Sequence, residues 1–178
     1  GWSPTDAELE VLLAMPIYEA YSIRKEDDTE VVDLLEQRWI PPQGAARELM
    51  DNRCLQLVQA EDASLYKCMQ ISMASEPAFL SEFVFPLRLQ ELDESQQDST
   101  IVGVLRSLPR LQQADPQFQA TLSKVAFVST ASGVRRYPTE VYHPDLKEIV
   151  AELLGADEHL PTGPFAESDI LDACGELG

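Results

Sequence analysis

Proline is the residue type that most constrains the fold of this chain, because it lacks a backbone N–H and disrupts the interior of an α-helix. The 178 residues include 12 prolines, and several of these stand at the ends of amphipathic segments. The first such segment, "SPTDAELEVLLAMP", ends at Pro16. In it Ser3 is the expected N-cap, Pro4 the first-turn proline and Asp6 the acid at the third position. The prolines therefore predict short amphipathic helices separated by loops.

Helical spacing dominates after Asp62, in segments that contain or border further prolines. Three of them read "SEPAFLSEFVFPLRLQEL", "STIVGVLRSL" and "DPQFQATLSKV", and each carries a stripe of apolar residues. Pro86 is expected to kink or split the first segment, because it removes one backbone hydrogen bond. Pro109 is expected to end or bend the second. In the third, Asp115 is the expected cap and Pro116 the first-turn proline.

The section from residue 15 to residue 60 has a different character. Its segments "PIYEAYSI" and "CLQLV" are short and rich in aromatic or aliphatic residues, which indicates strands. Between them, "VVDLLEQRWIPP" fits a strand or a helix, because its apolar run is too short for periodicity to decide. We expect a predominantly α-helical α+β fold with about six or seven helices. It would form one domain over 1–178, with a small β-containing section at 15–60 and a helical section at 62–178.

The charge balance excludes several classes of partner. The chain has 31 acidic and 13 basic residues, a net charge of −18, and such a surface repels phosphate backbones. We therefore expect no nucleic-acid partner and no membrane partner, since no apolar run approaches the roughly 18 residues of a membrane span. Cys54, Cys68 and Cys174 are far apart and set among apolar residues, which favours reduced thiols in a cytoplasmic protein. The two ends of the sequence indicate a fragment of a larger multidomain protein.

The sequence nominates no catalytic, metal-binding or cofactor-binding residue. His143 and His159 are the only histidines, and neither stands at metal-ligand spacing from a cysteine. The glycines are dispersed, without the Gly-rich loop that cradles phosphates. The segment "STASG" at 129–133 lacks the strand and helix context of a nucleophilic serine. We therefore expect a chain that is not an enzyme and takes no cofactor.

The segment "AFVSTASGVRRYPTEVY" predicts a strand end, a turn and a returning strand. Gly133 can adopt the positive φ that such a turn needs, and Pro138 closes the return. Phe127 and Tyr142 are expected to pin the two ends of the loop to the helical core.

Arg135 and Arg136 lie in this loop and are expected to remain outside the core. In a strongly acidic chain, exposed arginines most often pair with nearby carboxylates, at about 0 to 1 kcal/mol each. The alternative is that they dock onto another domain. Both interpretations stay open on sequence alone, and the two arginines are the candidate docking residues.

The segment "HPDLKEIVAELLG" predicts an amphipathic helix. Pro144 is the first-turn proline and Gly155 the expected left-handed cap. Its apolar face consists of Leu146, Ile149, Val150, Leu153 and Leu154. Burying five such side chains is worth on the order of 10 kcal/mol before entropy is subtracted, so we expect this helix to pack on the rest of the chain. The last segment, "SDILDACGEL", offers one more apolar stripe.

The order of these motifs resembles the repeats of the sacsin family of very large chaperone-related proteins, whose signature reads "FvPt..G.l..P.eLyDP". The matching residues here are Phe127, Val128, Thr130, Gly133, Pro138, Tyr142 and Pro144. The elements "MPIYEAY", "RWIPP", "EFVFPLRLQEL", "LLGADEHLPTGPF" and "ILDACGELG" are similar to family segments on either side, so the resemblance spans about residue 15 to 178. Ser129 stands where the family commonly has proline, and His143 where it commonly has aspartate.

The resemblance implies a part of a sacsin-type repeat that lies outside the ATPase module of the GHKL type, related to the heat-shock ninety chaperones. Sacsin-like proteins are linked to protein quality control and to intermediate-filament organisation. The implied role is a non-catalytic scaffold domain of a molecular chaperone or co-chaperone, which contacts protein clients or neighbouring modules of the same chain. The alternatives are a rigid structural spacer between ATPase modules and an enzyme domain with an unrecognised site.

Overall fold

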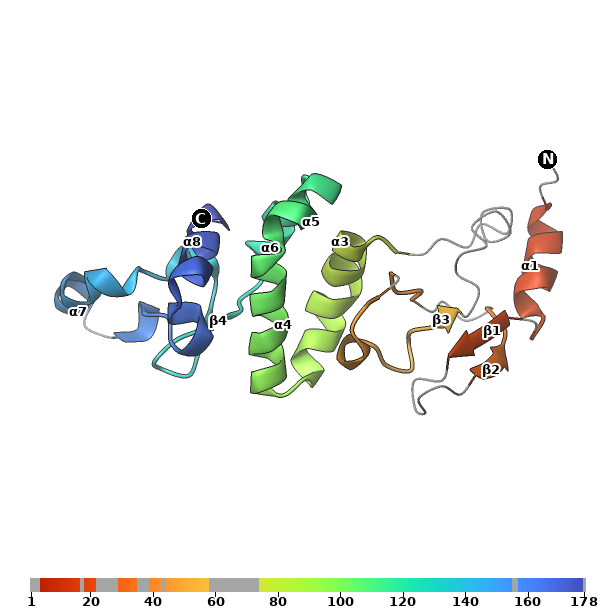
Figure 1. Ribbon diagram of the computed structural model, residues 1–178, viewed down its shortest axis with the longest axis horizontal. Helices are drawn as coiled ribbons and strands as arrows, with labels where there is room; N and C mark the ends of the chain where they lie inside the picture. Colours follow the sequence, from red (N-terminus) through yellow and green to blue (C-terminus); the bar gives the residue numbers. More distant parts are fainter. Residues whose placement is uncertain are drawn as a thin grey trace. The chain divides into compact units, whose positions relative to one another are not determined.

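The computed structural model describes residues 4–16, 18–21, 29–34, 39–42, 44–57, 74–154 and 157–177 (Figure 1). The chain divides into two compact units, Gly1–Val84 and Phe85–Gly178, and each is described by itself. That the chain forms a single domain stays a prediction. Cys68 and Gly155 lie outside the described residues.

The predominantly helical α+β fold is confirmed, with seven α-helices and two small antiparallel sheets in the described residues. The α-helices are α1 Asp6–Ala14, α3 Glu76–Phe79, α4 Glu94–Arg106, α5 Leu108–Ala114, α6 Phe118–Leu122, α7 Lys147–Leu154 and α8 Ser168–Leu177. The 3₁₀ helices are η1 Arg47–Leu49, η3 Leu89–Glu91, η4 Pro138–Glu140, η5 Pro144–Leu146, η6 Asp157–His159 and η7 Gly163–Ala166, and η2 Leu80–Arg88 is a π-helix. The strands are β1 Tyr18–Tyr21, β2 Thr29–Val32, β3 Gln56–Leu57, β4 Val128–Ser129 and β5 Arg135–Arg136.

Helix α1 forms where the sequence predicts it, but its cap is a different residue. Thr5, and not Ser3, is the N-cap, and Glu8, and not Asp6, is the acid of the capping box. The Glu8 carboxylate accepts from the backbone N–H and the hydroxyl of Thr5, both at 2.8 Å. These two hydrogen bonds, the backbone one first, lower the pKa of Glu8. Pro4 therefore precedes the helix and does not occupy its first turn.

The first unit contains a three-stranded antiparallel sheet in the order β2-β1-β3. Tyr18 and Ala20 of β1 are buried and form a cluster with Leu55, against which Leu9 and Leu12 of α1 pack. The Tyr18 hydroxyl donates to the backbone carbonyl of Leu12 at 2.9 Å. Both predicted strand segments therefore contribute strands, and the ambiguous segment between them begins as a strand; residues 35–38 lie outside the described residues.

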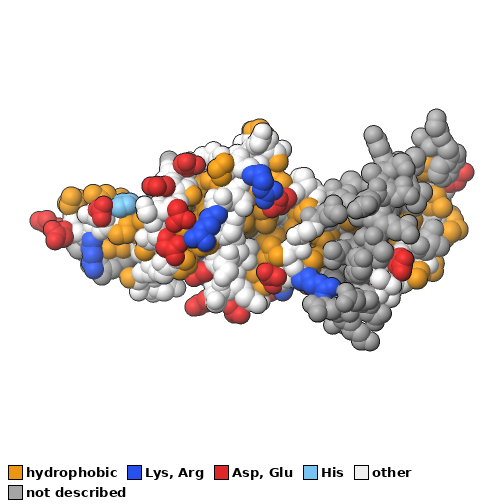
Figure 2. Space-filling model, in the orientation of Figure 1, with side chains coloured by type: hydrophobic (Ala, Val, Ile, Leu, Met, Phe, Trp, Pro, Cys, Tyr) orange, Lys and Arg blue, Asp and Glu red, His pale blue; other side chains and the backbone are white. Residues whose placement is uncertain are grey.

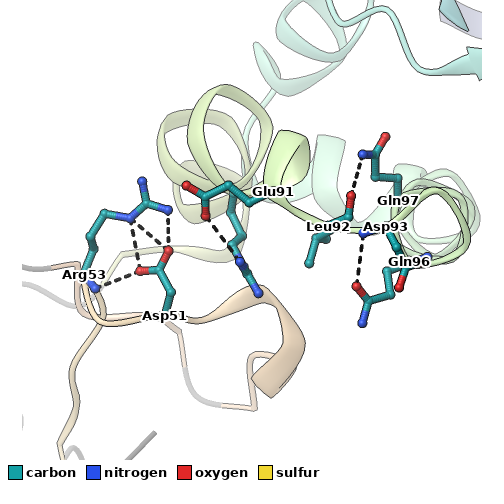
Figure 3. Close-up of polar contacts among 8 residues, drawn as sticks. Asp51, Arg53, Glu91, Leu92, Asp93, Gln96 and Gln97 are labelled. Carbon is teal, nitrogen blue, oxygen red and sulfur yellow. Dashed lines mark hydrogen bonds and ion pairs between the residues drawn. The ribbon is translucent and has the colours of Figure 1, made fainter.

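The first unit also contains an aromatic cluster. The Phe83 ring stacks on Phe79 with ring centroids 5.2 Å apart and contacts Trp39 at 5.8 Å. The Arg53 guanidinium lies 5.3 Å from the Phe83 ring centroid. Asp51 accepts from Arg53 Nε at 2.9 Å and holds the guanidinium in place (Figure 3). The Arg53 side chain of the Asp51–Arg53 pair thus makes a cation–π contact with the aromatic cluster.

Pro86 changes the hydrogen-bonding pattern of its helix. The helix begins as α3, continues as the π-helix η2 with Pro86 inside it, and ends as η3. A proline ring clashes with the carbonyl four residues earlier in an α-helix, and the wider π-turn moves that carbonyl away. The apolar stripe predicted here is buried at Phe79, Leu80, Phe83 and Val84, whereas Leu87 is exposed.

The second unit is built from α4, α5, α6 and α8. Asp93 and Gln96 form a capping box that starts α4, and Gln97 Nε2 donates to the Leu92 carbonyl at 2.8 Å (Figure 3). Pro109 stands at the start of α5. The fully buried side chains of these helices include Ile101, Leu105, Leu108, Leu111, Phe118, Leu122 and Ile170. The predicted stripes therefore form the core of this unit.

Helix α6 begins later than the sequence predicts. Its N-cap is Gln117, and the helix starts at Phe118. Asp115, the expected cap, instead accepts from the backbone N–H of Gln117 at 2.9 Å within the preceding turn. Pro116 lies in that turn and not in the helix.

Two of the cysteines, Cys54 and Cys174, are buried. Burial raises the pKa of the Cys174 thiol to about 11.

In the described ranges, no helix combines the length and apolar character that a membrane crossing requires.

Cys174 is expected to react with iodoacetamide far more slowly in the native chain than in unfolded chain. At pH 8 about a quarter of a free cysteine is thiolate, against about one part in a thousand for a thiol of pKa 11, so alkylation slows by about 100-fold or more. Between about pH 8.5 and pH 11, the Cys174 thiol ionises in the unfolded chain but not in the native chain. Its contribution to the free energy of unfolding is therefore complete below about pH 8.5 and declines as the pH rises towards 11. Peptide mapping of alkylation with and without urea tests this; equal rates would contradict it.

Candidate functional site

The loop predicted around Gly133 is an antiparallel hairpin. Strands β4 and β5 pair with Val128 opposite Arg136 and Ser129 opposite Arg135. Gly133 has a φ of 75°, and its N–H donates to the Thr130 carbonyl at 2.9 Å. The Thr130 hydroxyl, which is buried, donates to the Val134 carbonyl at 2.8 Å. The predicted strand, turn and return are therefore present.

Only one of the two expected aromatic pins reaches the core. Phe127 is fully buried and its ring lies 6.1 Å from that of Phe165. Tyr142 is instead 42% exposed, and its ring meets the edge of His159 at 5.9 Å. Pro138 is buried and opens η4. Pro138, and not Tyr142, is thus the buried residue on this side of the hairpin.

Arg135 is half-buried and serves the fold of the hairpin. Its guanidinium lies 2.8 Å from Asp98 Oδ1 of α4 and donates to the Phe127 carbonyl at 2.8 Å. The Ser129 hydroxyl also donates to Asp98, at 3.3 Å. Arg135 is therefore only partly exposed, and a carboxylate and a backbone carbonyl of its own unit take its hydrogen bonds.

Arg136 has a weaker attachment. Its Nη2 lies 3.3 Å from Glu158 Oε2, and 28% of the Arg136 side chain is exposed against 54% for Glu158. Both arginines thus lie in ion pairs within the second unit. The interpretation of the pair as partners of nearby carboxylates agrees with this geometry, and docking by them stays a prediction.

Replacing Arg135 with Gln is expected to lower the free energy of unfolding by about 1 to 2 kcal/mol, because it leaves Asp98 half-buried without its cation. The matched change Arg136→Gln removes a more exposed pair and is expected to cost about 0 to 1 kcal/mol. Urea unfolding of both variants, with Asp98→Asn for a double-mutant cycle, measures the difference. Equal costs for the two arginines would show that Arg135 does not anchor the hairpin.

Replacing Gly133 with Ala is expected to cost about 1 kcal/mol, because an L-residue is strained at positive φ. A Cβ at this position would meet nothing within 4 Å, so the cost comes from the backbone alone. Gly133→Asn should cost less, since asparagine tolerates this conformation. The midpoints of thermal unfolding rank the original chain and the two variants. An unchanged midpoint for Gly133→Ala would contradict the positive φ assigned to Gly133.

The two histidines have structural partners. Asp145 donates its backbone N–H to His143 Nδ1 at 3.3 Å, so His143 is the N-cap of η5, with Pro144 in its first turn. His159 Nδ1 lies 2.8 Å from the Glu140 carbonyl. Across the described part of the chain, no group of three or more His, Cys, Asp or Glu side chains is arranged to hold a metal ion.

The apolar face of α7 is exposed, contrary to the expectation that it packs on the rest of the chain. Val150 is buried, at 5% exposure, but Leu146, Ile149 and Leu153 are 42%, 56% and 77% exposed. The side chain of Leu154 lies outside the described residues. Of the four face residues whose side chains are described, one is thus buried, while the other three form an apolar row in solvent.

A second row of side chains runs beside these apolar residues. Asp145, Glu148 and Glu152 each precede one apolar residue of the row, and all three are exposed. Figure 2 shows hydrophobic and acidic side chains together over α7, at the left of the view. We call the two rows, Leu146, Ile149 and Leu153 with Asp145, Glu148 and Glu152, the α7 surface.

The sequence identified the apolar residues of the α7 surface but predicted that they pack on the rest of the chain. The repeated acid–apolar order at 145–146, 148–149 and 152–153 is the signal that could have identified the surface. Comparison with known proteins adds nothing to this: no family model, no curated protein and no solved structure matches the chain.

Proposed function

We propose that this chain is a non-catalytic interaction domain, a scaffold module of a sacsin-like cytoplasmic chaperone or co-chaperone in protein quality control. The observation that carries the proposal is the apolar row of the α7 surface, which lies in solvent although its spacing is that of a buried helix face. An amphipathic helix that displays its apolar face is the form in which many proteins recognise helical partners.

The row is large enough to bind and too small to bind tightly. Covering three aliphatic side chains that are 42%, 56% and 77% exposed is worth on the order of 3 to 4 kcal/mol before the cost of association. Single exposed aliphatic residues are common and mean little, whereas a contiguous row indicates a contact site. A client or a neighbouring module would therefore bind here reversibly.

The α7 surface is a better candidate for docking than the arginine pair. Arg135 and Arg136 are joined to Asp98 and Glu158, so a docking partner would have to compete with these carboxylates. No such competition exists for aliphatic side chains already in solvent. The proposal accordingly rests on α7.

A photo-reactive phenylalanine analogue at position 149, in chain expressed in the cytoplasm, is expected to crosslink discrete proteins that can be identified and then bound in purified form. The same analogue at the exposed position 172 of α8 is the matched control and should crosslink several-fold less. Leu153→Gln should reduce the yield from position 149, because it interrupts the apolar row while keeping the helix.

Equal crosslinking from positions 149 and 172 would defeat the interaction proposal and favour the rigid spacer. The purified chain is also expected to show no ATP hydrolysis above buffer. Turnover abolished by one substitution within the chain would instead favour an enzyme domain.

A further inference from the structure

The two rows of the α7 surface lie on adjacent faces of the helical segment formed by η5, which carries Asp145 and Leu146, and α7, which follows it directly. Successive residues of an α-helix are rotated by about 100°, so residues at i, i+3 and i+7 fall within a narrow sector. Leu146, Ile149 and Leu153 follow this spacing, and the acids occupy the same spacing one residue earlier. An apolar row therefore runs parallel to an acidic row over about two turns.

The charge of the surface lies on one side of its apolar row. Val150, on the other side of the row, is buried. The carboxylates therefore border the edge that faces solvent, and Asp145 is 87% exposed there. Lys147 lies beyond Val150, on the side away from the acids. A molecule that covers the apolar row meets three carboxylates along one edge.

Charge complementarity disfavours a second copy of this chain as the occupant. Two copies that each carry a net charge of −18 repel one another, and two α7 surfaces packed antiparallel would bring their acidic rows together. Like charges across an interface are costly, and three aliphatic side chains per copy fall well below the roughly 800 Å² per partner of a stable interface. The occupant must supply positive charge.

We propose that the α7 surface binds an amphipathic helix of a separate partner protein, in which lysine or arginine residues border an apolar row; this rests on the proposed function. The distance along the axis from Leu146 to Leu153 is about 10 Å, so the partner contributes about two turns. Its apolar residues recur at i, i+3 or i+4 and i+7, and its basic residues stand beside them to meet Asp145, Glu148 and Glu152. Exposed pairs of this kind add modest affinity and strong salt dependence.

Fluorescence anisotropy with the full 178-residue chain and synthetic helical peptides tests this. Four labelled peptides share a length of about 20 residues, as needed for a stable isolated helix. The first has an apolar row bordered by lysine, and the second and third have the same row bordered by glutamine or by glutamate. The fourth has the composition of the first with its apolar residues dispersed.

The lysine-bordered peptide is expected to bind most tightly, with Kd on the order of 0.1 to 1 mM, and to weaken severalfold when ionic strength is raised. Glu148→Gln with Glu152→Gln should weaken it about 3- to 10-fold, since two exposed ion pairs are lost. The control, Asp172→Asn with Glu176→Gln on α8, removes the same charge and should leave binding unchanged. Ile149→Gln with Leu153→Gln should abolish binding while circular dichroism shows the helices intact.

Each contrary result has a distinct meaning. Equal binding of the lysine and glutamine peptides, or no effect of the two Glu→Gln changes, would overturn the basic partner and leave the interaction function standing. Equal binding of the dispersed peptide would reduce the contact to nonspecific attraction and overturn the proposal. Self-association removed by Ile149→Gln and Leu153→Gln would identify a second copy as the occupant. No binding by any peptide, together with equal crosslinking from positions 149 and 172, would defeat both proposals.

Discussion

Packing around α8 is the constraint on which the second unit depends. This helix contacts α4, α6, η4 and η7, so it joins segments from both ends of the unit. Its Ile170 is fully buried, as are Ile101 of α4 and Phe165 of η7. Helix α7, by contrast, has its extensive contacts with its sequence neighbours η5 and η6. The exposure of its apolar row follows from this position outside the packing centred on α8.

The helices could be predicted from sequence wherever a cap and an apolar stripe coincide. The residues expected to be buried in α4 are buried. The error at α1 arose because Ser3 and Thr5 are both good N-caps, and the Glu three residues after Thr5 decides between them through the capping box. At α6, Asp115 instead caps the turn before the helix. The π-helix at Pro86 could not be predicted, because a proline inside a helical pattern is compatible with a kink, a break or a wider turn.

The candidate site was harder to predict than the fold, for a reason that applies to both of its parts. Periodicity identifies an apolar face but not the molecule that covers it, so Ile149 and Leu153 had the signature of core residues. The partner of Arg135 is Asp98 on α4, and local spacing carries no information on a contact between segments so far apart in sequence. Tertiary packing determines which of the two arginines is the more deeply buried in its ion pair. It also determines which aliphatic residues of the helix face are exposed to solvent.

The charge of the chain and the apolar row of α7 act on different stages of binding. A net charge of −18 attracts a basic partner over a distance of about one Debye length, and so affects the rate of encounter. The apolar row acts only on contact, and its small area sets a fast dissociation rate. Under the proposed function, a surface built in this way would favour frequent, short-lived contacts with basic amphipathic helices. Such exchange would suit a scaffold better than permanent assembly, because successive partners could occupy the same two turns.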